Sequence, residues 1–168
     1  ILFTFYFTLF LRRTVTAVVY NQAGVLSRIT STLNRRQVNI ESISVGTVER
    51  KDISRMTISF NVESEADAEQ VIKQLNKQIE VLKVTDLTHT PHVERELALI
   101  KVNAPANTRL EIQAMVSPFR ADIVDVAAST ITIQVVGHPD KVEACIEILK
   151  PYGIKRMART GVTSLIRG

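Results

Sequence analysis

Two hydrophobic periodicities alternate along this chain in a fixed order, and that order restricts the fold more than any other feature of the sequence. Apolar residues at every second position are typical of a half-buried strand, whereas spacings of three and four indicate an amphipathic helix. The expected strands are residues 14–20, 38–48, 56–62 and 79–87, and the expected helices are residues 25–36 and 65–75. The resulting order is βαββαβ, which is the ferredoxin-like pattern.

The same order returns, with weaker periodicity, in the second half. Strands are expected at residues 97–102, 123–127, 131–136 and from 154 onward, with one helix ending near residue 119 and another at 139–149. Ser64 and Thr108 each precede an acidic residue by three positions, as in a capping box, and Pro139 suits the first position of a helix. We therefore predict an α+β protein built from two ferredoxin-like βαββαβ domains.

The predicted domains are residues 12–88 and 95–168, joined by a linker at residues 89–94. Pro91 supports that linker, because proline interrupts a sheet ladder. Residues 1–11 are almost wholly apolar, but a membrane-spanning helix needs about 20 such residues. Positive charge follows this run, whereas a signal peptide places positive charge first. We therefore expect no membrane association, and we treat residues 1–11 as an N-terminal extension of uncertain origin outside the fold.

The amino-acid composition restricts the kinds of ligand that this chain is expected to bind. The only cysteine is Cys145, so neither a disulfide framework nor a cysteine zinc site is available, which fits a cytoplasmic protein. A formal net charge of +4 raises nucleic acid as a ligand. Single-stranded nucleic acid is usually held by stacking on exposed aromatic rings, and this chain has no tryptophan and carries four of its six phenylalanines within the first ten residues. We therefore expect no nucleic-acid binding.

The turn between the first strand and the first helix is the strongest candidate site. Gly24 opens the helix, where free backbone N–H groups attract a carboxylate or phosphate. Asn21 before the turn and Asn39 at the next strand each offer a carbonyl oxygen to an ammonium group. This combination suits a free amino acid. The alternative interpretation is an ordinary turn in which Gly24 only relieves strain, because a single glycine turn is a weak motif.

Other candidate sites are less well supported. His89 and His92 form an incomplete metal-ligand set, and Cys145 falls on the apolar stripe of its predicted helix, so we expect no metal site and no nucleophile. No phosphate-binding glycine loop is present, and no catalytic pattern of serine with histidine is recognisable. We expect no catalytic residues in this chain.

The pattern Asn21-x-x-Gly24-x-Leu26-x-Arg28, followed by Asn-Ile-Glu-Ser-Ile at 39–43, resembles the start of an ACT domain. Many ACT domains share this turn. The later blocks at residues 54–58, 93–102, 119–126 and 159–162 are more specific, and with them the chain resembles the small regulatory subunit of acetolactate synthase (acetohydroxyacid synthase) from Arg12 to Gly168.

This resemblance implies a non-catalytic regulator of branched-chain amino-acid biosynthesis. It would activate a large catalytic subunit, which would hold thiamine diphosphate, Mg²⁺ and FAD, and would confer feedback inhibition by valine. The chain itself would bind no cofactor. It would form a homodimer through its ACT domains, which agrees with the open face that a one-sided sheet leaves.

The resemblance also implies roles for individual residues. The amides of Gly24 and Val25 would meet the valine carboxylate, and Asn21 and Asn39 would meet its ammonium. The candidates for the apolar pocket are Leu26, Ile40 and Val45. The effector would lie between two ACT domains, with the turn from one subunit and the strand from the other. Leucine and isoleucine remain alternatives, since one methylene changes the binding free energy by only ~1–3 kcal/mol.

Three other functions are compatible with a ferredoxin-like fold. The chain could be an amino-acid-sensing ACT module acting on a different partner, a nucleic-acid binder favoured by its positive charge, or an enzyme. The missing aromatic residues disfavour the second, and the missing acid–base set disfavours the third.

Overall fold

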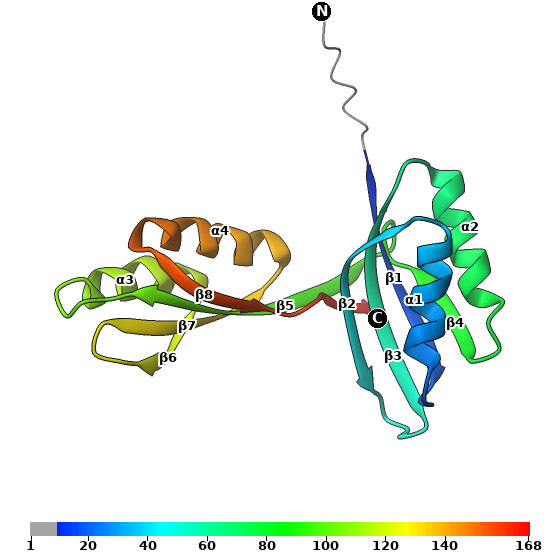
Figure 1. Ribbon diagram of the computed structural model, residues 1–168, viewed down its shortest axis with the longest axis horizontal. Coiled ribbons are helices and arrows are strands. Elements are labelled where there is room, and N and C mark those ends of the chain that lie inside the picture. The colour runs from blue at the N-terminus through cyan, green and yellow to red at the C-terminus, as the bar shows by residue number, and fades with distance from the viewer. Residues whose placement is uncertain (1–9) are drawn as a thin grey trace, which may run out of the picture. The chain divides into compact units, whose positions relative to one another are not determined.

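A computed structural model describes residues 10–168, which divide into two compact units (Figure 1). The division falls between His92 and Val93, and the last three residues, Ile166–Gly168, return to the first unit. Arg167 makes part of this return, since its main-chain N–H donates to the carbonyl of Pro91 at 3.0 Å. Most of the predicted N-terminal extension, residues 1–9, lies outside the described residues.

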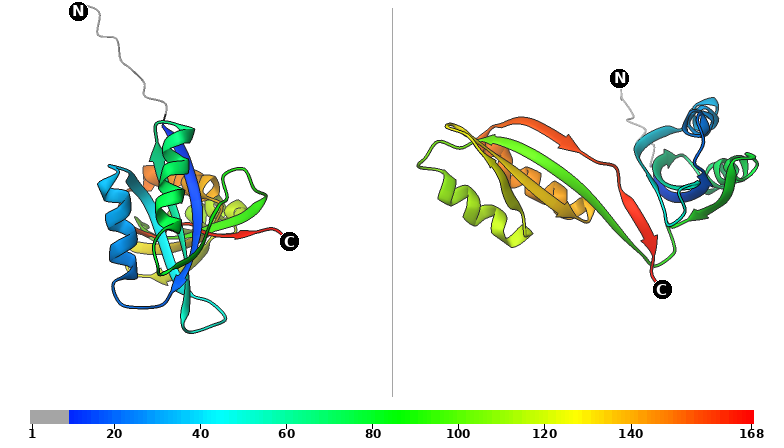
Figure 2. Two further views of the ribbon diagram at one scale, coloured as in Figure 1. Left: turned by 90° about the vertical axis from the view of Figure 1, so that its right-hand side faces the viewer. Right: turned by 90° about the horizontal axis from the view of Figure 1, so that it is seen from below.

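The first unit has the predicted βαββαβ order. Its elements are β1 (Leu11–Tyr20), α1 (Val25–Arg35), β2 (Asn39–Thr47), β3 (Ile53–Val62), α2 (Glu65–Asn76) and β4 (Val81–Asp86). The strands form one antiparallel sheet in the order β2-β3-β1-β4. Both helices cover the same face of that sheet (Figure 2). This arrangement confirms a ferredoxin-like fold and leaves β2 and β4 as the two edges.

Strand β1 begins three residues earlier than the sequence analysis expected. Leu11 pairs with Val62 and packs against the core, so this residue of the supposed extension belongs to the sheet. The apolar run before residue 12 concealed the alternation that marks a strand. Arg13 is the unexpected buried residue here, and its guanidinium lies between Glu65 and Asp86 and contacts His89 Nε2 at 3.0 Å.

The second unit repeats the plan with one addition. Its elements are β5 (His92–Asn103), α3 (Arg109–Val116), β6 (Asp122–Val126), β7 (Thr130–Gly137), α4 (Pro139–Leu149), β8 (Ile154–Arg159) and β9 (Thr163–Ile166), with short 3₁₀ turns after α3 and α4. The sheet order β6-β7-β5-β8 is the same as in the first unit. Strand β9, which the sequence analysis did not predict, pairs with β5. Strand β5 starts five residues earlier than expected, at His92.

The helix signals were only partly right. Ser64 caps α2 through a hydrogen bond from the Asp67 N–H to its hydroxyl at 3.2 Å, and Pro139 occupies the first turn of α4, as predicted. The predicted capping box at Thr108 was wrong. Its hydroxyl donates to the carbonyl of Pro105 at 3.1 Å and makes no cap, because a short turn before α3 directs it there.

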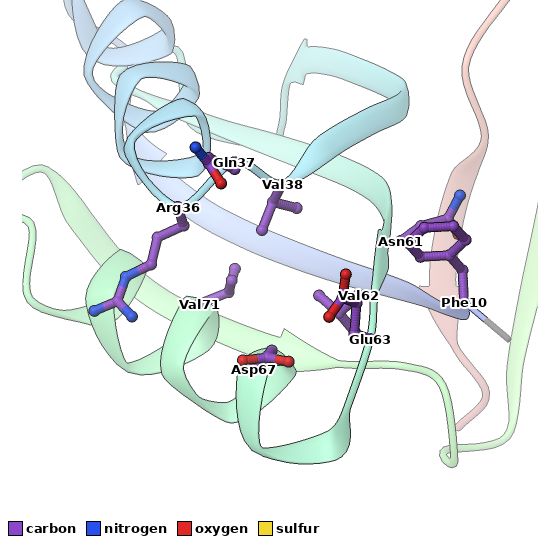
Figure 3. A pocket seen from close by; sticks show the side chains of 9 residues that line it. All are labelled: Phe10, Arg36, Gln37, Val38, Asn61, Val62, Glu63, Asp67 and Val71. Carbon is purple, nitrogen blue, oxygen red and sulfur yellow. The ribbon is translucent and has the colours of Figure 1, made fainter. Parts of the chain in front are cut away.

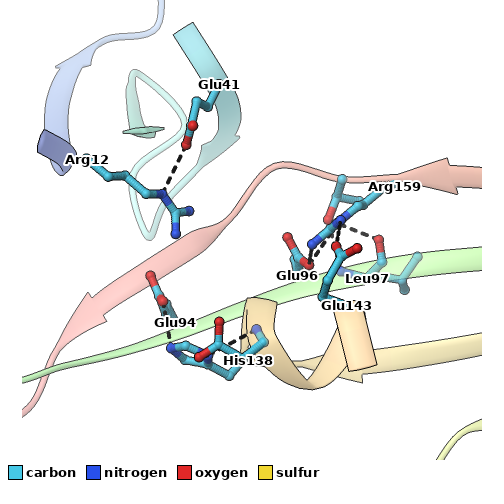
Figure 4. A network of polar contacts seen from close by, with 10 residues as sticks. Arg12, Glu41, Glu94, Glu96, Leu97, His138, Glu143 and Arg159 are labelled. Atoms are coloured by element: carbon cyan, nitrogen blue, oxygen red, sulfur yellow. Dashed lines mark hydrogen bonds and ion pairs between the residues drawn. The ribbon is translucent and has the colours of Figure 1, made fainter. Parts of the chain in front are cut away.

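An ion pair between the buried Glu96 and the partly exposed Arg159 stabilises the start of β5 within the second unit (Figure 4). Glu96 accepts from the Arg159 guanidinium at 2.9 Å, and Glu143 on α4 accepts from it at 2.8 Å. Burial alone would lower the pKa of Arg159, but these two hydrogen bonds outweigh it and the pKa is raised. Separately, in the first unit, Arg12 pairs with Glu41 at 3.1 Å.

Each unit has its own apolar core between sheet and helices. In the first unit the sheet residues of the core pack against α1 and α2. The core residues include Val15, Ala17 and Val19 of β1, Ile58 and Phe60 of β3, and Ile29, Leu33 and Leu75 of the helices. The second core is built in the same way around Ile100, Ile133, Val142 and Leu149. Among the helices in the described part of the chain, none has the length and apolar character required to cross a membrane.

Phe60 is the largest fully buried side chain of the first unit, so its truncation tests the assigned core. We expect Phe60→Ala to lower the free energy of unfolding by about 3–5 kcal/mol, because the deleted ring leaves a cavity. Val45→Ala, at an exposed position of β2, is the control and should change it by less than about 0.5 kcal/mol. Urea unfolding followed by circular dichroism measures both. Equal effects of the two substitutions would contradict the assignment.

Candidate functional site

The turn from β1 into α1 has a backbone that requires glycine. Gly24 has φ +83° and ψ −7°, which is the left-handed region, and it stands at the N-cap of α1 without any side-chain cap. Non-glycine residues are disfavoured there because Cβ crowds the backbone. Gly24 therefore allows the chain to reverse sharply. Because it has no side chain, it also leaves the N-terminus of α1 uncovered.

Several amides at this terminus have no acceptor. Arg28 N–H makes the first intrahelical bond, to the Gly24 carbonyl at 3.0 Å, and Val25 N–H makes a long 3.4 Å contact with the Gln22 carbonyl. Within the described residues, the N–H groups of Gly24, Leu26 and Ser27 have no hydrogen-bond partner. The turn therefore presents three donors together with the positive end of the helix dipole, which suits a carboxylate.

Asn21 is held next to these donors by the β2–β3 hairpin. Its main-chain N–H donates to the Asp52 carbonyl at 2.8 Å, and its side-chain Nδ2 donates to the Lys51 carbonyl at 2.9 Å. The hairpin is itself braced, because Arg50 donates to the Asp52 carboxylate and holds the pKa of Asp52 below its usual value. With Nδ2 engaged, the Asn21 side-chain oxygen is the atom left to accept from an ammonium group.

Arg28 is a residue at this turn that the sequence analysis did not select. A Cβ on Gly24 would lie 3.6 Å from Arg28 Nη1, so the guanidinium stands directly beside the turn. Glu80 pairs with it at 2.8 Å. The signal was available, because residues four apart on a helix share a face and Arg28 follows Gly24 by four. Its guanidinium adds N–H donors beside the turn, while Glu80 offsets its charge.

Asn39 does not lie near this turn within one chain. Asn39 pairs with Asn61 near the end of β3, whereas Asn21 contacts the residue just before β3 begins. The eight residue steps from Ile53 to Asn61 span about 26 Å of extended strand, at about 3.3 Å per step. One small amino acid therefore cannot contact both asparagines of a single chain. Ile40, next to Asn39, is half-buried against the core.

The remaining selected residues divide between core and surface. Val25 is buried in the core of the first unit, so only its backbone faces the turn. Leu26 and Val45 are exposed, at 44% and 46% of their surface. Val45 pairs with Met56, and it therefore lies toward the hairpin end of β2, away from Asn39. Leu26 and Val45 are thus free to contact an apolar side chain, but the turn and the Asn39 end remain two separate places.

A hollow of about 300 Å³ lies at the Asn39 end of the unit (Figure 3). Asn61, the cross-strand neighbour of Asn39, forms part of its wall. Its other residues combine apolar side chains with both signs of charge: Phe10, Arg36, Gln37, Val38, Val62, Glu63, Asp67 and Val71. No local sequence pattern marks this hollow, because its walls come from four segments that only the folded unit brings together: the residue before β1, the α1–β2 loop, the end of β3 and α2.

The residues considered as metal ligands or nucleophile have other contacts. His89 contacts Arg13, and His92 Nδ1 lies 2.7 Å from the Thr90 carbonyl. Over residues 10–168, no group of three or more His, Cys, Asp or Glu side chains is arranged to hold a metal ion. Cys145 is fully buried in the second core, and burial raises the pKa of its thiol, which keeps it protonated and unreactive.

Substitutions at Gly24 test whether the left-handed backbone conformation of this residue matters for stability. We expect Gly24→Ala to destabilise the protein by roughly 1–2 kcal/mol, because alanine resists positive φ. Gly24→Asn should destabilise it less, since asparagine visits this region more readily. Thermal unfolding of the two variants measures the difference. Equal stability of Gly24→Ala and the parent protein would mean that the turn does not require a left-handed residue.

Comparison with known proteins agrees with both units. Residues 16–83 match the family model described as the AHAS small subunit-like ACT domain, and residues 95–168 match the one described as the small subunit of acetolactate synthase. The chain is 54% identical to the acetolactate synthase small subunit of Bacillus subtilis, over 94% of this chain and 92% of that protein. It is 47% identical to the small subunit of Mycolicibacterium smegmatis, over 92% and 91%.

A solved structure shows the same fold at full length. The crystal structure of the acetolactate synthase small subunit from Thermotoga maritima superposes with a TM-score of 0.85 at 36% identity, covering 94% of this chain and 98% of that one. Family models, relatives and structure therefore agree, and the chain belongs to the family of acetolactate synthase small subunits, with an ACT domain in its first half.

Proposed function

We propose that this chain activates the thiamine-diphosphate-dependent large subunit of acetolactate synthase and makes it sensitive to feedback inhibition by valine. The observation that carries the proposal is the set of amides at the Gly24 turn that have no acceptor among the described residues, together with Asn21 in the same turn. Thiamine diphosphate, Mg²⁺ and FAD would be held by the large subunit in the cytoplasm, and this chain would supply no reacting group.

The turn complements a free amino acid in both charge and shape. The amides of Gly24, Leu26 and Ser27 and the guanidinium of Arg28 would bind the carboxylate. The Asn21 oxygen would accept from the ammonium, and the exposed side chain of Leu26 would contact a small branched side chain. Valine is the smallest branched-chain effector that meets these requirements, and leucine and isoleucine have the same charge pattern.

Because Asn39 lies far from the turn within one chain, an effector that contacts both must lie between two copies of the chain. Strand β2 is an edge of the four-stranded sheet, and sheet edges are common places for pairing with a second chain. If two copies pair antiparallel through β2, the Asn39 end of one strand lies beside the Thr47 end of the other. The Thr47 end is also the end of the sheet at which the Gly24 turn lies (Figure 1). Each effector would then be bound by the turn of one subunit and by Asn39 of its partner.

The direct test is valine inhibition of the reconstituted enzyme. Gly24→Asp should bring a carboxylate to the position of the ligand carboxylate, and aspartate tolerates positive φ better than most residues. Asn39→Ala removes a hydrogen bond to a charged group, worth about 1.5–3 kcal/mol, and should raise the half-inhibitory valine concentration about ten- to a hundredfold. Both variants should still activate the large subunit.

The unfolding temperature of each variant serves as its control. Unchanged valine inhibition in a folded Gly24→Asp variant would remove the turn as the effector site. Failure of the parent chain to raise acetolactate formation by the large subunit would refute the regulatory function as a whole.

Mixing the two variants tests whether the site is shared between subunits. In a two-fold dimer, a hybrid of Gly24→Asp and Asn39→Ala chains has one site with both defects and one site with neither. Because about half of randomly mixed dimers are hybrids, mixing should restore about a quarter of the parent valine sites. Isothermal titration of the mixture, after unfolding and refolding together, measures this. If each site lay within one chain, mixing would restore no sites at all.

A further inference from the structure

A hollow of about 410 Å³ lies in the second unit and contains none of the residues of the proposed effector site. We call it the basic hollow, and its lining residues are Arg95, Arg120, Val136, Gly137, His138 and Lys141. It lies where the end of β7 leads into α4, beside the start of β5. Three cationic side chains therefore converge in a part of the molecule to which the proposed function gives no role.

These three cations are not neutralised. In the described part of the chain, Arg95, Arg120 and Lys141 form no ion pair, whereas Arg159, Lys101 and Lys150 of the same unit each pair with a carboxylate. Glu94 lies 2.9 Å from His138 Nε2 (Figure 4). Asp140 lies 3.3 Å from His138 Nδ1. The hollow consequently keeps a positive charge that a ligand or partner can neutralise.

The lysine and one arginine are held by main-chain atoms. Lys141 Nζ donates to the Val136 carbonyl at 2.9 Å, and Arg95 Nη1 donates to the Glu94 carbonyl at 2.7 Å. The Lys141 side chain reaches its position only because residue 137 is glycine, since a Cβ there would lie 2.5 Å from Lys141 Cδ. Arg120 adopts φ +50°, which is unusual for arginine. The cations are thus positioned without using carboxylates.

The helix terminus beside the hollow argues against a free phosphate as the occupant. Phosphate sites at helix N-termini rely on free main-chain N–H groups. Here Pro139 has none, and the Asp140 N–H donates to His138 Nδ1 at 3.3 Å. The side-chain donors remain, and Arg95, Arg120 and Val136 are all exposed. Long cationic side chains around an open, partly apolar hollow suit carboxylates that protrude from another protein surface.

We propose that the basic hollow is a docking site for an acidic segment of the catalytic large subunit. This inference rests on the proposed function, because it takes the large subunit as the partner. Charged groups of this kind mainly accelerate encounter and fix orientation, and their effect falls as salt screens them. The second unit would then provide attachment, while the first unit binds the effector.

The test measures binding of the full-length chain to the immobilised large subunit by surface plasmon resonance. Arg120→Asp reverses one charge, and aspartate tolerates the left-handed backbone at this position. We expect it to weaken binding about tenfold at low salt, with a smaller difference at high salt. Lys155→Glu, which makes the same charge change at an exposed position of β8 outside the hollow, should alter binding by less than about twofold.

Gly137→Ala separates geometry from charge, because it displaces the Lys141 stem without changing the net charge; it should also weaken binding. Equal effects of Arg120→Asp and Lys155→Glu would overturn the proposal. Pyrophosphate binding is measured for the same two proteins. If pyrophosphate binds the parent chain but not Arg120→Asp, and Arg120→Asp binds the large subunit as tightly as the parent does, the hollow is a site for a small anion and the docking proposal is overturned. No binding of the parent chain to the large subunit would instead refute the proposed function itself.

Discussion

The antiparallel pairing of β2 with β3 governs the arrangement of the candidate effector site. A strand has a fixed length per residue, so residues at its two ends cannot approach each other. Asn39 is held at one end of the sheet by its pairing with Asn61, and the β2–β3 hairpin that holds Asn21 is at the other. The same pairing places β2 at an edge of the four-stranded sheet. One constraint thus separates the two halves of the site and supplies the edge through which a second copy can bring them together.

The Gly24 turn shows how a weak sequence motif acquires chemical meaning from its surroundings. A glycine with positive φ is common at turns and would not by itself mark a site. Here three amides have no acceptor within residues 10–168, Arg28 lies beside the turn, and the hairpin holds the Asn21 side chain. A carboxylate bound there would gain from several donors and a cation at once, which is the basis of the proposed valine site.

The two units share a topology but place their charges differently. In the first unit Arg28 and Arg50 are paired with carboxylates close to the turn. In the second unit Arg95 and Lys141 of the basic hollow donate to main-chain carbonyls, and in the described residues neither is paired with a carboxylate. We relate this difference to different tasks, since an effector site needs a few directed hydrogen bonds and a docking site benefits from unscreened charge. The copies of one fold can therefore be used for sensing and for attachment.

The sequence by itself determined the fold class, because alternating periods of 2 and 3.6 specify strands and helices locally, and their order leaves few topologies. It also placed Asn21 and Gly24 in the turn between the first strand and the first helix, since turn residues act through their own backbone. Its errors fell at Leu11, at β9 and at Thr108, where pairing with distant strands or a short local turn decides the outcome. Only the tertiary structure decided that Asn39 lies far from Gly24, and that Arg95, Arg120 and Lys141 meet. The physical reason is that sheet register and chain crossing set distances between residues remote in sequence, and no local pattern encodes those distances.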